Sequence, residues 1–296
     1  MAEPQGNREH KDRLFLKVFE DKEALLSLYN AVNGSDYENP EELEITTLDN
    51  VLYMRMKNDL SFLIDGSLNF YEHQSTFNPN MPLRGCFYMV KVYQEYVERR
   101  QLDIYSSTRL TLPTPRFIVF YNGTDRMKHT PELTLKLSDS FEKQEEEPAL
   151  ECKARVININ YGFNTEIMEK CPKLYEYSFL ISKIREETSQ GKKLEAAIGA
   201  AIDICVEEGI LTDLLTSYRM EVIGMLLTEY DEERHLKNTY EEGVKKGQKK
   251  GESIGEFRQL YKLIQKNFLT LHDAASANSM TEEQLVATFK KYGITK

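Results

Sequence analysis

The pattern of hydrophobic and polar positions divides the chain into a first part that mixes strands with helices and a later part that is helical. Apolar residues recur at threes and fours over 11–32, which predicts a helix that breaks near Glu20–Lys22 and stops at Asn33–Gly34. After an acidic loop, 43–48 is a short candidate strand. Two apolar segments then flank Asp65–Gly66, a dipeptide typical of a tight hairpin turn, so we expect two strands of one hairpin.

Further along, residues 83–100 have the apolar spacing of a helix, with Tyr88, Val92 and Tyr96 on one stripe. Two continuous apolar runs, 116–121 and 154–160, are typical of buried central strands. The order helix, three strands, helix, strand, strand predicts a compact α/β core.

Strand patterns end at about Asn164, and the rest of the chain is predicted to be helical. We therefore expect three parts: an α/β domain over 1–163, a helical region over 164–240, and a glycine-repeat helix or linker with a small helical tail over 241–296. The repeat consists of Gly243, Gly247, Gly251 and Gly255. Because glycine weakens helices, a solvated helix or linker is favoured there over a close helix-packing face. The tail resembles a helix-turn-helix in outline only, and a small packing or oligomerisation unit is the favoured interpretation.

The composition narrows the class of protein. Asp and Glu number 48 against 38 Lys and Arg, and this net charge of -10 argues against non-specific coating of nucleic acid, although a local basic patch could hold a duplex. The four cysteines are scattered without metal-ligand spacing, which favours buried reduced thiols. No apolar run approaches membrane-spanning length and no leader pattern is seen, so we expect a cytoplasmic protein without a membrane partner.

The hairpin carries the candidate chemistry. Asp59 opens its first strand, and Glu72-His73-Gln74 lies on the second. Since side chains alternate along a strand, Glu72 and Gln74 are predicted on one face and the imidazole of His73 on the other. The two carboxylates and the backbone carbonyl of His73 could bind Mg²⁺, with Mn²⁺ as an alternative, and Gln74 could orient a water. On the residues alone a structural interpretation stays open, with Asp59 as a turn residue and Glu72 and Gln74 on a solvated sheet face.

Other chemistry is weakly indicated. Arg84 and Tyr88, one helical turn apart just after the acid-bearing strand, could reach a phosphate. Phosphate-binding loops, dinucleotide fingerprints, zinc-ligand spacing and nucleophile elbows are missing from the sequence. Nucleotide-cofactor, zinc and triad-hydrolase functions are therefore not indicated.

The segments LFLKVFED, MKNDLSFLI, NFYEHQS, MPLRGCFYMVKVYQEYV and RFIVFYNG occur in this order. Through these segments, about the first half to two-thirds of the chain resembles the Rpn family of recombination-promoting nucleases, also described as YhgA-like transposases. This family belongs to the PD-(D/E)XK nuclease superfamily. The resemblance implies a restriction-endonuclease-like core, with a central mixed sheet flanked by helices. It also implies a Mg²⁺-dependent DNA endonuclease that promotes recombination or movement of genetic elements. It matches Asp59 and Glu72 to the metal-binding acids, and Gln74 to the position where the family commonly has glutamine instead of the superfamily lysine. Asn58 stands where the superfamily name expects proline.

Three functions follow as hypotheses. The first is the DNA endonuclease. The second is a protein of the same fold that has lost cleavage and binds DNA or a protein partner. The third is a helical interaction protein whose α/β half is a scaffold, with a homo-oligomer formed through the helical C-terminal region.

Overall fold

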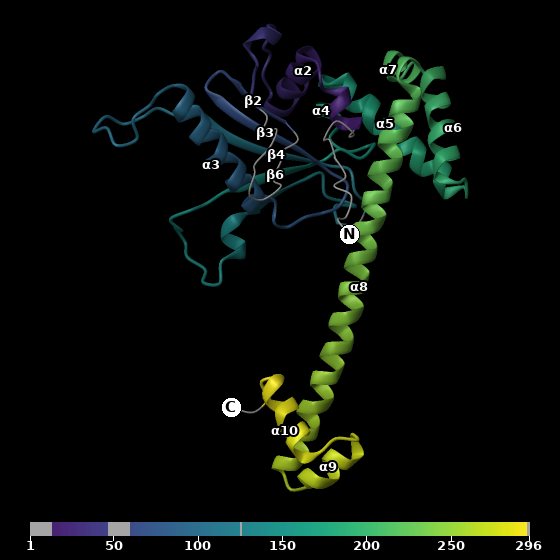
Figure 1. The fold of residues 1–296 in the computed structure, drawn as a ribbon. Coiled ribbons are helices and arrows are strands. Elements are labelled where there is room, and N and C mark those ends of the chain that lie inside the picture. Colours follow the sequence, from purple (N-terminus) through teal and green to yellow (C-terminus); the bar gives the residue numbers. More distant parts are fainter. Residues whose placement is uncertain (1–13, 47–59, 125, 295–296) are drawn as a thin grey trace, which may run out of the picture. The chain divides into compact units, whose positions relative to one another are not determined.

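The computed structural model describes residues 14–46, 60–124 and 126–294. The chain forms two compact units, Met1–Glu233 and Arg234–Lys296. The first unit is an α/β fold, in which a six-stranded mixed sheet is flanked by helices (Figure 1). This confirms the expected α/β class with a mixed sheet flanked by helices.

The sheet has the strand order β1-β2-β3-β4-β6-β5. Its strands are β1 (Glu44–Ile45), β2 (Leu60–Ile64), β3 (Ser67–Gln74), β4 (Thr114–Tyr121), β5 (Glu132–Lys136) and β6 (Lys153–Asn158). Strands β3, β4 and β6 are mutually parallel, whereas β1, β2 and β5 pair antiparallel with their neighbours. The apolar runs predicted as central strands are β4 and β6, so that prediction is confirmed.

Strands β2 and β3 form the predicted hairpin. Asp65 and Gly66 have φ values of 43° and 68°, the left-handed conformations that a two-residue type I′ turn requires. The turn sets a register in which Leu60 lies opposite Tyr71 and Ser61 opposite Phe70. Strand β3 then continues past the described part of β2 and keeps pairing with β4 as far as Gln74.

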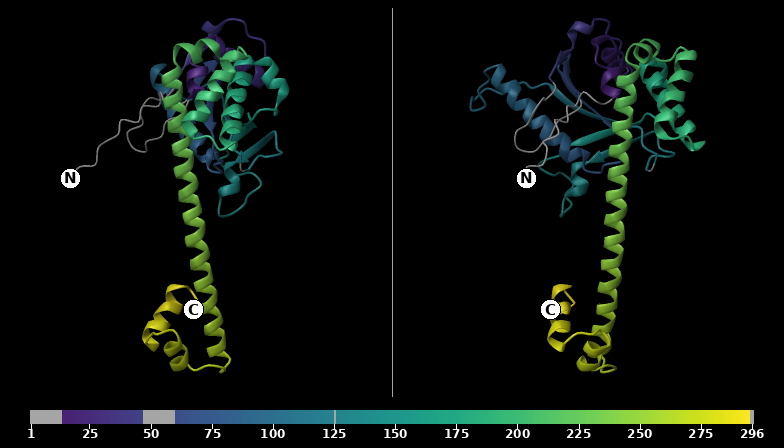
Figure 2. Two further views of the ribbon diagram at one scale, coloured as in Figure 1. Left: turned by 90° about the vertical axis from the view of Figure 1, so that its right-hand side faces the viewer. Right: turned by 45° about the vertical axis from the view of Figure 1, so that its right-hand side comes forward.

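Helices α1 (Leu14–Val18) and α2 (Lys22–Asn33) cover one face of the sheet. The break between them is the predicted one, because Asp21 caps α2 by accepting a 2.7 Å hydrogen bond from the amide of Ala24. Gly34, with φ of 67°, ends α2. The same core includes apolar residues of α4 (Thr165–Lys170), α5 (Pro172–Ser189), α6 (Leu194–Glu207), α7 (Thr212–Ser217) and the start of α8 (Arg219–Gln265). Helices α5 and α6 lie side by side there (Figure 2).

Helix α3 (Met81–Arg99) covers the other face. Its Tyr88 and Val92 are buried against strands β3, β4 and β6. The helix approaches the sheet so closely at Gly85 that an added Cβ would lie 2.3 Å from Cδ1 of Phe117. Only glycine fits at this position, and its absent side chain sets the distance between α3 and the sheet.

Strand β5 was not predicted. Its sequence, ELTLK, leaves glutamate, threonine and lysine half-exposed or exposed at the edge of the sheet. This five-residue pattern is too short to stand out before the acidic loop at 142–147. The 3₁₀ turns at Pro40–Glu42 and Leu137–Ser140 were not predicted either.

The four cysteines are free and buried, as predicted. Burial raises the pKa of Cys205 from 9.0 to about 12, and burial, then the charges of Cys86 and Glu151, raise that of Cys152 from 9.0 to about 11. We expect the native protein to react slowly with a thiol-specific chromophore at pH 8, with the cysteines becoming reactive once urea unfolds it.

The same shifts give a pH dependence. Above pH 9.0 an unfolded thiol loses a proton that the folded chain retains at Cys205. The stabilising contribution of these thiols is therefore complete below pH 9.0 and is lost as the pH rises towards about 11 and 12. Urea titrations from neutral to alkaline pH measure this loss of stability. For the reactivity experiment, rapid thiol labelling of the native protein at pH 8 would contradict the burial of the cysteines.

The second unit contains the later part of α8, with α9 (Leu271–Ala277) and α10 (Glu282–Lys291). Ala274, Ala275, Leu285 and Phe289 form its small core. The predicted capping box is present at Thr281 and Gln284. The tail therefore packs around a small apolar core of its own.

The four repeat glycines lie within α8, and a Cβ added at each would meet nothing within 4 Å. The interpretation as a solvated helix agrees with this open space. Within the described ranges, no helix combines the length and apolar character needed to cross a bilayer.

Candidate active site

Glu72 lies near the end of β3, with its side chain only 1% exposed. Its carboxylate Oε2 accepts a hydrogen bond from Nη2 of Arg84 at 3.1 Å, and the two charges form an ion pair. Burying a carboxylate is costly unless it is paired and hydrogen-bonded. The interpretation of Glu72 as part of a solvated sheet face is therefore wrong, and β3 holds a desolvated negative charge against α3.

Arg84 and Tyr88 are brought together with this carboxylate, one helical turn apart on α3. The Tyr88 hydroxyl accepts hydrogen bonds from Nη2 of Arg84 at 2.8 Å and from Nε at 3.2 Å. The Arg84 side chain is 32% exposed, so its guanidinium spans from the buried carboxylate to the surface. The next residue, Gly85, lets α3 lie close to the sheet, and this allows the Arg84 side chain to reach Glu72.

Gln74 is on the same face of β3 as Glu72, as predicted, because it pairs in register with Tyr121 of the α3-facing core. Its side chain is half-buried. Its backbone carbonyl accepts from the amide of Asn122 at 3.1 Å and so faces β4. Successive carbonyls along a strand alternate in direction, so the carbonyl of His73 faces the opposite side, towards the edge where β2 pairs.

The imidazole of His73 points to the other face, which confirms the predicted alternation. It is 3% exposed, stacks on Phe15 with a centroid distance of 4.9 Å, and its Nε2 lies 2.9 Å from the Tyr177 hydroxyl. Tyr177 in turn accepts from the side-chain amide of Asn122 at 3.2 Å. His73 is thus a core histidine held by α5, and no local sequence signal predicted its contact with Tyr177.

Asp59 lies outside the described residues. The residue after it, Leu60, is the first of β2 and lies opposite Tyr71, the neighbour of Glu72. Leu60 and Tyr71 pack in the core on the α2 face.

The carboxylate of Glu72 and the carbonyl of His73 are oxygen donors, the type that Mg²⁺ prefers. Among the residues that the structure describes, no group of three or more His, Cys, Asp or Glu could hold a metal ion. Near the end of β3 the described residues therefore provide the single carboxylate of Glu72.

The remaining cations of α3 are engaged in surface contacts. Lys91 and Arg99 lie 3.7 Å and 3.6 Å from the carboxylate of Glu95, and Arg100 lies over the ring of Tyr96. These three cations therefore do not extend the group formed by Glu72, Arg84 and Tyr88 along the helix.

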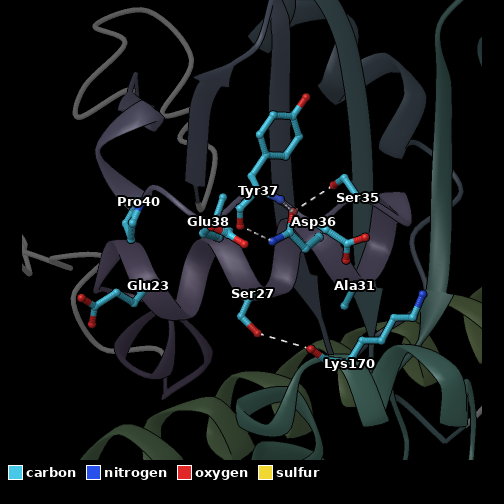
Figure 3. A pocket seen from close by; sticks show the side chains of 11 residues that line it. Glu23, Ser27, Ala31, Ser35, Asp36, Tyr37, Glu38, Pro40 and Lys170 are labelled. Atoms are coloured by element: carbon cyan, nitrogen blue, oxygen red, sulfur yellow. Dashed lines mark hydrogen bonds between the residues drawn. The ribbon is translucent and has the colours of Figure 1, made fainter.

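A hollow of about 400 Å³ beside α2 also contains acids. Glu23 and Asp36 lie at its opposite ends and their carboxylates point away from each other (Figure 3). The predicted site residues do not contribute to its lining. This hollow is therefore separate from the acid on β3.

Replacing Arg84 with glutamine is expected to lower the free energy of unfolding by about 2 kcal/mol, because the buried carboxylate of Glu72 loses a charged hydrogen-bond donor. Urea denaturation at neutral pH measures this. The matched control is Arg99→Gln on the same helix, where the side chain is 65% exposed. An equal, small effect of both substitutions would contradict the role of Arg84.

Comparison with protein-family models, with curated proteins and with solved structures gives no match for this chain.

Proposed function

We propose that this chain is a divalent-metal-dependent DNA endonuclease with a restriction-endonuclease-like core. The observation that carries the proposal is the buried carboxylate of Glu72 near the end of β3, paired with a half-exposed arginine and followed on the same face by Gln74. A desolvated acid with a specific charge partner is typical of functional sites. The sequence resemblance assigns the same residue, Glu72, to the metal.

The hairpin register supports a role for Asp59. If the pairing of Leu60 with Tyr71 continues by one residue, Asp59 becomes the partner of Glu72 and shares its face of the sheet. Directly opposed residues in antiparallel strands have Cβ atoms about 5 Å apart, a separation over which two carboxylates can share one cation. The proposal requires this continuation.

The residues then have distinct roles. Asp59, Glu72 and the carbonyl of His73 would hold Mg²⁺ or Mn²⁺, and the bound ion would supply the positive charge that polarises a phosphate and activates a water. Gln74 orients the attacking water by hydrogen bonding. Arg84 balances the charge of Glu72 and presents its exposed edge to a DNA phosphate, and Tyr88 fixes the guanidinium.

The biological setting is part of the proposal. The substrate is DNA, cleavage promotes recombination or movement of genetic elements, and the protein acts in the cytoplasm. The helical C-terminal region, beyond Asn164, forms the contact between copies in a homo-oligomer.

Cleavage of supercoiled plasmid tests the proposal. Purified full-length protein is incubated with plasmid and Mg²⁺ or Mn²⁺, and in parallel with excess EDTA. Nicked or linear product with metal and none with EDTA is the expected result. DNA left intact under all metal conditions, while the protein is folded, would contradict an endonuclease.

One observation favours a second candidate, a DNA- or partner-binding module without cleavage. The superfamily lysine is replaced by Gln74, which brings no positive charge to the water, and the nearest described charge partner of Glu72 is Arg84. Retention of plasmid in a gel-shift assay without any metal-dependent product would favour this alternative.

A further inference from the structure

A second hollow, of about 430 Å³, lies where β6 leads into α4 and α5. Its lining includes Tyr161, Phe163, Met168, Glu169, Tyr175 and Ser178. It does not include the residues proposed for cleavage. Its volume lies within the range of about 300–1,000 Å³ that small-molecule sites have.

Aromatic rings dominate this hollow. Tyr161 lies 5.9 Å from Tyr175 and 5.6 Å from Phe179, measured between ring centroids. Tyr161 and Tyr175 are 48% and 38% exposed, so parts of both rings remain open to solvent. The face of an aromatic ring is electronegative and attracts cations. This cluster already attracts one, since Nζ of Lys183 lies 5.4 Å from the ring centroid of Phe179.

The charge in the hollow is negative. Among the described residues that line it, Glu169 is the charged one. The pKa of Tyr175 is raised by a hydrogen bond with Tyr161, then by burial and by the charges of Tyr161 and Glu208. Glu208 is therefore a second acid near the cluster. The carboxylates of Glu169 and Glu208 would repel a phosphate group. The nearby ammonium of Lys183 is paired with Glu186 at 2.8 Å. The charges around the rings therefore favour a cationic ligand over a nucleotide.

A buried hydroxyl adds an independent observation. Ser178 lines the hollow, is 3% exposed, and its Oγ has no hydrogen-bond partner within the described residues. Leaving a buried hydroxyl unpaired is unfavourable, so such a group at a cavity wall indicates a partner that arrives with a ligand.

We propose that this hollow binds a small organic ammonium ion that carries a hydroxyl or amine on a short chain. The ammonium group lies over Tyr161 and Tyr175 and near Glu169, and the hydrogen-bonding group meets Ser178. The proposal does not depend on DNA cleavage.

Isothermal titration of the full-length protein with choline chloride tests the proposal, alongside dimethylbutanol, the neutral carbon isostere of choline. Choline is expected to bind roughly tenfold more tightly, because only its charge engages the ring faces. Equal binding of the two compounds, or binding of neither, would overturn the proposal.

Two variants locate the site. Tyr161→Leu keeps an apolar side chain and is expected to reduce choline affinity about tenfold by removing a ring face. Glu169→Gln, at an exposed position, is expected to weaken choline binding and leave dimethylbutanol binding unchanged. The control is Tyr105→Leu, a tyrosine that is 92% exposed elsewhere in the same unit. Circular dichroism establishes folding, and the same loss of affinity in all three variants would contradict the assignment.

Discussion

Glu72→Gln is expected to lower the single-turnover rate of plasmid cleavage about 1,000-fold, which corresponds to roughly 4 kcal/mol of transition-state stabilisation. Glutamine keeps nearly the shape of the side chain in its buried position but removes the negative charge that the proposed metal requires. Asp59→Asn is expected to cause a loss of the same order. Because two ligands of one metal act as a unit, the double variant should be little worse than either single variant.

The matched control is Glu187→Gln. Glu187 is also a buried acid, 7% exposed, and it pairs with Lys192 on the far side of the sheet from α3. This variant should cleave at close to the rate of the unaltered protein. Cleavage unaffected by Glu72→Gln would show that the nuclease activity comes from another site or from a contaminant.

Gly85→Ala is expected to lower the free energy of unfolding by about 3 kcal/mol, the upper end of the usual cost of overpacking. The added Cβ would lie 2.3 Å and 2.5 Å from two ring carbons of Phe117, so α3 or the ring must shift. Phe117 is buried in the core between α3 and the sheet and has little room to move. A shift of α3 would also carry Arg84 away from Glu72, and we expect cleavage to fall with stability.

Urea denaturation and plasmid cleavage measure the two effects together. The matched control is Gly199→Ala in α6, where an added Cβ meets nothing within 4 Å. There the better helix propensity of alanine should raise stability by up to about 1 kcal/mol. Equal stabilities of the Gly85 and Gly199 variants would contradict the close approach of α3.

The hairpin and the direction of its side chains could be predicted because both depend on local rules. Asp65–Gly66 selects the turn, and the two-residue alternation of a strand then separates Glu72 from His73. The helix break at Asp21 and the capping box at Thr281 were predictable for the same reason.

The environment of each site residue was not predictable, because it depends on packing between distant segments. The burial of Glu72 comes from α3, whose approach is set by one glycine against Phe117. The contact of His73 with Tyr177 joins residues 104 positions apart.

The domain division was expected after residues 163 and 240, whereas the compact units meet at Glu233 and Arg234. Helices α5 and α6 share the apolar core of the sheet through residues such as Leu180 and Ile198. Their helical sequence pattern alone carries no sign of this shared core.

Titration of the protein with Mn²⁺, followed by electron paramagnetic resonance of the free ion, tests the central claim that the acids of the hairpin hold a divalent cation. The unaltered protein is predicted to bind one Mn²⁺ that the double variant Asp59→Asn, Glu72→Gln does not bind, while Glu187→Gln binds it normally. Equal Mn²⁺ binding by the unaltered protein and the double variant, or no binding by either, would contradict the account.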